Sequence, residues 1–407
     1  MTNTVKSTVF VISIACLIAG NLIGAGILAL PINTGLAGLI PSLFVMVVFG
    51  CAMFFSAVVL GKEAVETRQE NFNYPSLYER HLGITGKWIA SLTNLLILYG
   101  LLTAYITGGS TIIASLLEYK TSPWWLMLMF TGALSVITAA DLSIVKKYNA
   151  LLIVAIITAF AILCLAGGKN IHVGRLARSD WFFLPATVPI VITAFHFHNI
   201  IPTICRDMNW NLSLIWKAML LGMTIGFILN AVWITVGIGV LPLEGDNSLL
   251  AAFTGNQPAT VPMSAILHSH AFTLCAAMFS LIAITTSYMA NGIGLMDFIR
   301  DIGENSFKVK SKIFVIVGTF APPLLISLVW PDIFLKALNI VGGVGIVILF
   351  GILPGILAWR KNESRNMRIL SGIMLLLFGL GLLFEIGQEF GLLHIQPDIE
   401  HWSHMIK

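Results

Sequence analysis

The sequence predicts an all-α polytopic membrane protein, and three observations support this fold class. Hydrophobic residues fill 57% of the 407 positions, charged residues only 10%, and the mean hydropathy is +0.91. Soluble domains carry about 25% charged residues. Apolar stretches long enough to cross a bilayer recur along the chain, and Lys and Arg favour alternate connections between them. An ordinary soluble protein is therefore excluded.

Eleven apolar segments are the predicted transmembrane helices, each near the roughly 20 residues that a bilayer core requires. The predicted spans are 9–31, 36–61, 88–117, 123–141, 148–167, 183–205, 213–241, 263–298, 313–331, 333–358 and 369–393. With the N-terminus inside, 17 of the 23 Lys and Arg fall in cytoplasmic connections and six on the other side. Because cytoplasmic loops retain positive charge, we expect the N-terminus inside and the C-terminus outside.

Two connections between the predicted helices are longer than a tight turn. Segment 62–87 is expected to be a cytoplasmic loop with a short helix around Leu77–Leu82. Segment 242–262 lies on the outer side and is rich in Pro and Gly. It is interpreted either as an extracellular lid or as a plain surface loop.

The first predicted helix has three glycines within seven residues at its middle. The run reads Gly20-Asn21-Leu22-Ile23-Gly24-Ala25-Gly26 and is followed by Pro31. Glycine has low helix propensity, so a membrane helix could unwind here. Small residues also line tight helix contacts, and the sequence of this helix alone leaves both interpretations open.

The sixth predicted helix strengthens the case for unwinding. Its middle reads Ala194-Phe195-His196-Phe197-His198-Asn199-Ile200-Ile201-Pro202. Two imidazoles, an amide and a helix-breaking proline at bilayer depth are costly unless they face a cavity. A membrane histidine can also simply bond a neighbouring helix, but this combination favours a functional role.

The two interrupted helices open two five-helix sets, 9–167 and 183–358, with 369–393 as an additional helix. Since five is odd, the second set enters the membrane from the opposite face, which indicates inverted repeats with a binding site at the midplane. Free N–H groups at the start of a half-helix can bind a carboxylate, and orphan carbonyls can bind an ammonium or a cation. Helices one and six contain no Asp, Glu, Lys or Arg, so this chemistry suits a zwitterion.

At these residues the chain resembles the hydroxy and aromatic amino acid permeases, the group of bacterial tyrosine and tryptophan carriers within the amino-acid/polyamine/organocation superfamily. The matching stretches are 20–31, Phe197-His198 followed by Pro202, and Thr285-Thr286-Ser287-Tyr288 leading to 292–298. The family's glycine before Phe-His is His196 here. The resemblance implies a leucine-transporter-like fold, alternating access and a multi-pass position in a bacterial inner membrane.

The resemblance also implies a substrate site for an amino acid, with tyrosine or tryptophan favoured and serine, threonine or another neutral amino acid as the alternative. The N–H groups of Ala25 and Gly26 would bind the carboxylate, and the carbonyls of Leu22, Ala194 and Phe195 would face the ammonium. The implied site residues are Asn21, Leu22, Gly24, Ala25, Gly26, Tyr99, Ala194, Phe195 and His198, with Tyr105 as the alternative to Tyr99.

Coupling to an ion is the second implication of the resemblance, with a proton favoured over sodium. A sodium ion would sit between helix 1 carbonyls and helix 8 hydroxyls, at Gly20, Ile23, Thr285, Thr286 and Ser287. These hydroxyls could instead bond their own helix. For a proton, His198 is the favoured titratable side chain near neutral pH, with His196 as the second candidate.

Other polar residues are assigned simpler roles. Glu385 and Glu389 could form a proton relay, but an interfacial or intersubunit role is favoured. Amides in the spans are expected to bond neighbouring helices, namely Asn94, Asn230, Asn291 and Asn339.

Several function classes do not fit the sequence. Basic residues are scattered, so nucleic acid is not an expected partner. The five cysteines show no CxxC or zinc spacing, and no cofactor is expected. Enzyme and Walker motifs are absent from the sequence, and a channel would need a polar lining at every depth rather than at one.

Overall fold

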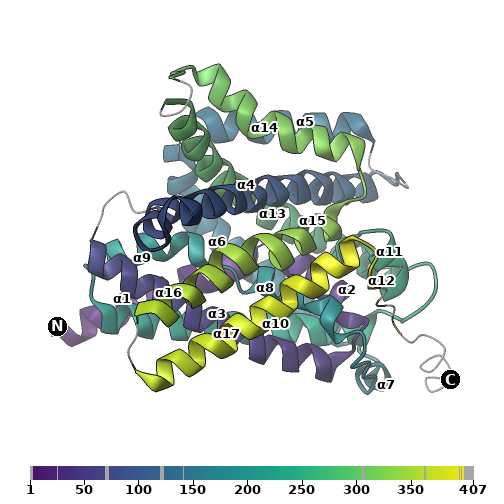
Figure 1. Ribbon diagram of the computed structural model, residues 1–407. Helices are drawn as coiled ribbons and strands as arrows, with labels where there is room; N and C mark the ends of the chain where they lie inside the picture. Colours follow the sequence, from purple (N-terminus) through teal and green to yellow (C-terminus); the bar gives the residue numbers. More distant parts are fainter. Residues whose placement is uncertain are drawn as a thin grey trace.

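The protein is a bundle of helices (Figure 1). The structure is a computed structural model that describes residues 3–24, 26–68, 73–119, 123–140, 142–304, 308–361, 364–393, 395 and 397. Every regular element within these ranges is helical. The all-α prediction is therefore confirmed for the described part of the chain.

The first part of the chain supplies long helices and one interrupted helix. It comprises α1 (Asn3–Leu22), α2 (Gly26–Gly35), α3 (Leu39–Thr67), α4 (Tyr74–Leu116), α5 (Trp124–Ala140), α6 (Leu142–Gly168) and the short α7 (Val173–Leu176). Helices α1 and α2 are bent by 58° at their break.

The second part begins with another interrupted helix. It comprises η1 (Leu184–Thr187), α8 (Val188–Ala194), η2 (His198–Ile200), α9 (Ile201–Asp207), α10 (Leu212–Val240), α11 (Leu249–Thr254), α12 (Thr260–Leu267), α13 (His270–Ile302), α14 (Lys312–Val329), α15 (Phe334–Ile340), the π-helical η4 (Val341–Ile352), α16 (Leu353–Lys361) and α17 (Arg365–Glu389). Helices α15, η4 and α16 form one continuous helical stretch.

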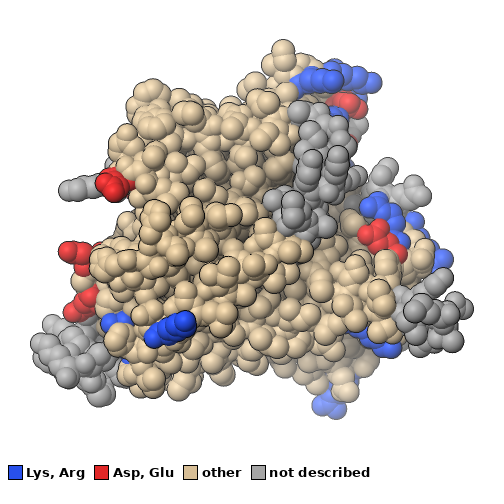
Figure 2. All heavy atoms as spheres, turned by 180° about the vertical axis from the view of Figure 1, so that it is seen from behind, with Lys and Arg blue, Asp and Glu red and all other residues tan. Residues whose placement is uncertain are grey.

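The helices and the charge distribution are those of a multi-pass membrane protein. Among the described residues, eight helical stretches are long and apolar enough to cross a bilayer, or nine if α1 and α2 count as one bent span. Two shorter apolar helices cover Trp124–Ala139 and Val154–Gly168. On the face in Figure 2, the Lys, Arg, Asp and Glu of the described residues lie toward the margins of a broad uncharged band.

Segment 62–87, which was predicted to be a loop, is mostly helical in its described residues. Helix α3 continues to Thr67, and α4 begins at Tyr74, where the Asn73 side chain caps it by accepting from Ser76 N at 2.8 Å. The short helix predicted around Leu77–Leu82 is confirmed. It joins the rest of α4 through Gly83, whose φ of 71° turns the chain and suits a residue without a Cβ.

Segment 242–262 is packed rather than extended into solvent. It contains α11, whose Leu249 is buried, and Ala259 N donates to Leu28 O of α2 at 2.8 Å. The prediction of one span over 263–298 is wrong at its beginning. Helix α12 ends at Leu267, and α13 starts at His270, because Ser269 caps it by accepting from Phe272 N at 3.3 Å.

The connection before η1 fastens the C-terminal end of α2. Arg178 donates to the Gly35 carbonyl, and Asp180 N donates to Ala37 O at 2.7 Å. Gly38 has a φ of 91°, and a Cβ there would collide with the Arg178 carbonyl. Burial lowers the pKa of Arg178 to about 10, against the opposing effect of Asp180. The end of α2 is therefore fixed by main-chain contacts as well as by a buried cation.

Candidate functional site

The first predicted helix break is present. Helix α1 ends at Leu22 and α2 begins at Gly26. Ile23 N still donates to Ala19 O at 3.1 Å, and Ile27 N donates to Gly24 O at 3.1 Å. A Cβ at Gly24 would lie 3.2 Å from Asn21 O, so the glycine allows the close turn. Ala25, a predicted carboxylate ligand, lies outside the described residues.

The second predicted break is also present. Helix α8 ends at Ala194, Phe195–Phe197 leave the regular helix, and the chain resumes through η2 into α9. Pro202 lies in the first turn of α9, where a proline is tolerated. Both interruptions therefore occur where glycine or proline signals placed them.

The two breaks lie against each other. Asn21 Nδ2 donates to the His196 carbonyl at 3.2 Å and lies 3.5 Å from Asn199 Oδ1. A Cβ at Gly26 would stand 3.5 Å from Ala194 Cα. The structure thus brings together predicted site residues from segments that are far apart in the sequence.

Three other predicted site residues at the breaks, Leu22, Phe195 and Gly20, differ in their burial and packing. Leu22 is buried and packs against Gly226 of α10. The Phe195 ring is buried, stacks on Phe227 at 6.3 Å and covers Gly50 of α3. Gly20 is partly buried, and a Cβ added there would have no other atom within 4 Å among the described residues.

The hydroxyls of α13 differ in their surroundings. A Cβ at Gly24 would lie 3.3 Å from Ser287 Oγ, so Ser287 approaches the α1–α2 break directly. Thr286 Oγ1 instead donates to Ile282 O at 2.9 Å within its own helix. Thr285 is half-buried, and Ile23 is buried. Of the predicted ion ligands, Ser287 is the hydroxyl seen at the break.

Of the two tyrosines considered for α4, Tyr105 is the one beside this region. Its hydroxyl accepts from Asn291 Nδ2 at 3.3 Å and lies near Ser287. Tyr99 Oη instead donates to Gly318 O of α14 at 2.6 Å. Six positions along a helix rotate a side chain by roughly 120° to another face. Tyr99 is therefore replaced by Tyr105 as the residue next to the break.

The rings of His196 and His198 stack on each other, 5.9 Å between centroids, and both lie against Phe350 of η4. Their rings are nearly parallel, and each ring centroid is 5.0 Å from that of Phe350. The Tyr74 hydroxyl donates to the His198 carbonyl, and the Ser56 hydroxyl to the Phe350 carbonyl.

The His198 imidazole is buried without a partner. Neither of its nitrogens makes a hydrogen bond of standard geometry within the described part of the chain, and a main-chain group of Met53 lies close to the ring. Nε2 of His196 also lacks a described partner. Unpaired polar atoms in a buried position indicate a site that water, an ion or a ligand completes.

Sequence reasoning missed several contacts that support the breaks. Trp233 Nε1 of α10 donates to Ile27 O at 2.9 Å. Asn33 Nδ2 of α2 donates to Asn339 Oδ1 at 2.8 Å, and Thr193 Oγ1 donates to Leu338 O at 3.1 Å. Proline, glycine and amide content did not reveal these pairings, because each depends on how two distant helices are rotated.

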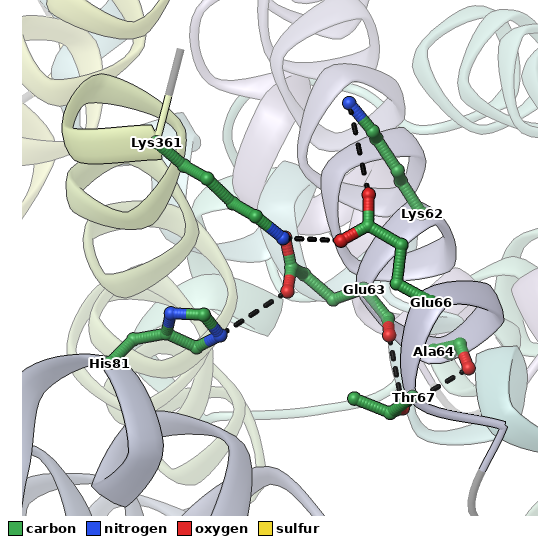
Figure 3. A network of polar contacts seen from close by, with 7 residues as sticks. All are labelled: Lys62, Glu63, Ala64, Glu66, Thr67, His81 and Lys361. Carbon is green, nitrogen blue, oxygen red and sulfur yellow. Dashed lines mark hydrogen bonds and ion pairs between the residues drawn. The ribbon is translucent and has the colours of Figure 1, made fainter.

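A charged cluster lies at one end of the bundle, where α3 and α16 end and α4 begins (Figure 3). Lys361 Nζ lies 2.7 Å from Glu63 Oε1 and 2.5 Å from Glu66 Oε2. His81 Nε2 is 3.3 Å from Glu63 Oε2, and Lys62 is 3.9 Å from Glu66. We call these five residues the end cluster.

The two glutamates of α17 have different environments. Glu389 forms an ion pair with Lys336 at 2.9 Å near the surface. Glu385 is 4% exposed and packs on Gly343 of η4. An interfacial role was predicted for both carboxylates; it suits Glu389, whereas Glu385 is buried within its own chain.

Comparisons with known proteins agree with this architecture. Residues 7–387 match the model of the tryptophan/tyrosine permease family. The tyrosine-specific transport system 1 of Haemophilus influenzae is 28% identical over 370 residues, which cover 89% of this chain and 90% of that protein. The tyrosine-specific transport system 2 of the same organism is 25% identical over 379 residues, covering 90% and 92%. The low affinity tryptophan permease of Escherichia coli K12 is 23% identical over 409 residues, covering 92% and 96%.

Proposed function

Because the chain belongs to the tryptophan/tyrosine permease family, we propose that it imports tyrosine or tryptophan as a secondary active transporter in a bacterial inner membrane. It is a transporter and not an enzyme. The names of its relatives, two tyrosine-specific transport systems and a tryptophan permease, support an aromatic substrate. The ion gradient and the choice between the two amino acids are the finer parts of the proposal.

The observation that carries the proposal is the meeting of two helix breaks between Asn21 and His196. The N-terminus of α2 presents main-chain N–H groups and the positive end of its dipole, which suit the substrate carboxylate at Gly26 and Ala25. Carbonyls at the ends of α1 and α8 suit the ammonium. In this scheme Leu22, Gly24, Ala194 and Phe195 shape the cradle, and Tyr105 closes it.

The proposed architecture is a pair of inverted five-helix repeats, 9–167 and 183–358, with helix 369–393 added. Among the described residues, nine long apolar stretches, counting α1 and α2 as one bent span, and two shorter apolar helices are compatible with this division. In Figure 1, α9, α16 and the start of α1 lie at one end of the bundle, and α7, α11 and α12 at the other. The first end would be cytoplasmic, as the distribution of Lys and Arg predicts.

Proton coupling is proposed through His198, whose buried ring nitrogens lack partners among the described residues. Protonation of an imidazole next to a helix break would change the balance between two states of the break, and so link proton entry to alternating access. The sodium alternative would use Ser287 with carbonyls of Gly20 and Ile23.

Transport by the purified protein in proteoliposomes tests this proposal. Radiolabelled tyrosine, tryptophan, serine and threonine would be offered separately, with a pH gradient or a sodium gradient imposed alone. We expect uptake of tyrosine or tryptophan driven by the pH gradient. Uptake of serine or threonine alone would reject the aromatic assignment, and dependence on sodium alone would reject proton coupling.

Counterflow distinguishes a carrier from a channel. Unlabelled tyrosine inside the vesicles should accelerate entry of labelled tyrosine, because a carrier returns faster when it is loaded. A channel shows no such stimulation, and its absence together with fast uptake would overturn alternating access.

A further inference from the structure

Asn230 is a buried amide that lacks the partners expected for one. It lies in the middle of α10 with 0% exposure, and neither Oδ1 nor Nδ2 has a hydrogen bond within the described part of the chain. Other amides in the bundle are bonded, as Asn291 is to Tyr105 and Asn339 to Asn33. The prediction that Asn230 bonds a neighbouring helix is therefore not met. An unpaired amide in a desolvated position is unfavourable unless something else completes it.

The register of α10 against α1 and α2 shows what Asn230 faces. These helices run side by side, and successive contacts advance together along both. The contacts pair Gly222 with Ile18, Gly226 with Leu22, Trp233 with Ile27, and Gly237 with Pro31. The paired residue numbers differ by 204 in the first two contacts and by 206 in the last two. Position 230 therefore falls opposite Gly24 and Gly26 at the α1–α2 break.

The same face of α10 also forms a hydrogen bond with the main chain next to the break. One turn after Asn230, the Trp233 indole donates to Ile27 O at 2.9 Å and so satisfies a main-chain carbonyl of α2. The Trp233 ring lies among Phe160 and Phe279, with ring centroids 5.8 Å and 6.2 Å away. This apolar wall excludes water, so a hydrogen bond made beside it is strengthened by the low dielectric.

We propose that Asn230 is a further substrate-binding residue, whose Nδ2 donates a hydrogen bond to the carboxylate of the amino acid held at the α1–α2 break. The inference rests on the proposed function. A carboxylate is the ligand favoured here because the start of α2 already presents N–H groups and a positive dipole end. The amide adds a directional donor from a second helix without placing a charge in the membrane.

Binding of two ligands to two variants tests the inference. L-Tyrosine and L-tyrosinamide differ in that the amide has no anionic carboxylate. We expect Asn230→Ala to weaken tyrosine binding by roughly 10- to 100-fold, the range for a hydrogen bond to a charged group. Binding of tyrosinamide should weaken by less, roughly 2- to 10-fold, because its neutral carbonyl can still accept from the amide but gains less than an anionic carboxylate does. Asn230→Ser, which keeps a shorter donor, should recover part of the tyrosine affinity.

Thr224→Ala is the matched control, because Thr224 lies on the exposed side of the same helix and bonds Leu220 O of its own turn. It should bind both ligands as the unaltered protein does. Equal loss of both ligands in Asn230→Ala, with a normal elution profile in detergent, would show that Asn230 is structural and overturn the inference. If Asn230→Ala does not fold, the Asn230→Ser variant decides by the same comparison.

The unaltered protein separates this inference from the proposed function. Binding of neither tyrosine nor tryptophan would count against the proposed function, and the inference would fall with it. Binding of a different amino acid would reject the aromatic assignment alone, and the comparison would then use that amino acid and its amide. Tight tyrosine binding with no discrimination by Asn230→Ala would reject only the role of Asn230.

Discussion

The helix breaks and the end cluster are two polar regions of one molecule with opposite organisation. The break segments 20–26 and 194–202 contain no Asp, Glu, Lys or Arg, and His198 there and Asn230 on the neighbouring α10 have buried atoms without described partners. In the end cluster four of the five residues are Lys or Glu, and each side chain contacts another of the cluster: Glu63, for example, contacts both Lys361 and His81. The difference indicates which region is complete by itself and which is completed by a ligand.

Electrostatics explains why the two regions differ. A charge at the middle of a bilayer is expensive, so a central site built from main-chain dipoles and amides avoids a permanent charge when it is empty. At the end of the bundle Lys62, Glu66 and Lys361 are partly exposed and screened by solvent, whereas the buried carboxylate of Glu63 is offset by its contacts with Lys361 and His81. Glu63 on α3 reaches Lys361 at the end of α16 and His81 on α4, so the end cluster ties three segments together (Figure 3).

The largest loss of substrate affinity is expected when a bulky side chain is introduced at Gly26, where α2 contacts Ala194 of α8. Gly26→Val should reduce substrate affinity by roughly 100-fold or more, because branched atoms beyond a Cβ that is already 3.5 Å from Ala194 would separate α2 from α8. Equilibrium binding of labelled tyrosine measures the change. Gly132→Val on α5 is the control, since a Cβ there meets no described atom within 4 Å. If Gly26→Val retains its affinity for tyrosine, the substrate carboxylate does not bind at the N-terminus of α2.

The second effect concerns the unpaired imidazole. His198→Ala should lower uptake driven by a pH gradient by about tenfold, while insertion into the membrane stays normal, since the ring carries the proposed proton. Tyrosine counterflow without a gradient should fall less. Exposed His270 of α13 provides the control variant His270→Ala. Unchanged kinetics in His198→Ala would argue that the ring only fills space beside Phe350.

Local signals in the sequence predicted the breaks well. The three glycines of 20–26 and the polar run before Pro202 act on their own backbone, and both interruptions fall there. Tyr99 and Tyr105 could not be separated, because the choice depends on the rotation of α4 within the bundle. The Ser269 cap was missed because the short polar run His268-Ser269-His270 was included in one continuous predicted span.

Contacts between segments that are far apart in the sequence could not be predicted from the sequence. Glu63 and Lys361 are 298 positions apart, and Asn33 and Asn339 are 306 apart. Composition indicated that such polar residues need partners, but any of many amides or charges could have supplied them. The register of α10 along α1 and α2 likewise follows from packing of small residues such as Gly226 against particular side chains.

A third, smaller loss of affinity is expected within α13, where the neighbouring hydroxyls of Ser287 and Thr286 can be compared. Ser287→Ala should weaken substrate or ion binding by roughly 2- to 10-fold, the range of one neutral hydrogen bond, because its hydroxyl faces Gly24 at the break. Thr286→Ala should have almost no effect, since that hydroxyl is bonded to Ile282 O. Tyrosine affinity measured at several sodium concentrations checks both variants. If Thr286→Ala loses more tyrosine affinity than Ser287→Ala, then Thr286 and not Ser287 is the hydroxyl that contributes at the break.

The smallest effect on transport is expected in the end cluster, where a loss should appear as stability instead. Lys361→Met leaves the buried Glu63 carboxylate with His81 as its remaining ion-pair contact, so it should lower the free energy of unfolding by about 3 kcal/mol while tyrosine affinity changes by less than about twofold. Thermal unfolding in detergent and equilibrium binding measure the two quantities on the same sample. Glu63→Gln combined with Lys361→Met should lose less stability than the two single losses together, because the pair is removed as a unit. A tenfold loss of affinity in Lys361→Met with unaltered stability would show that the end cluster controls access to the breaks, and the contrast between the two regions would no longer hold.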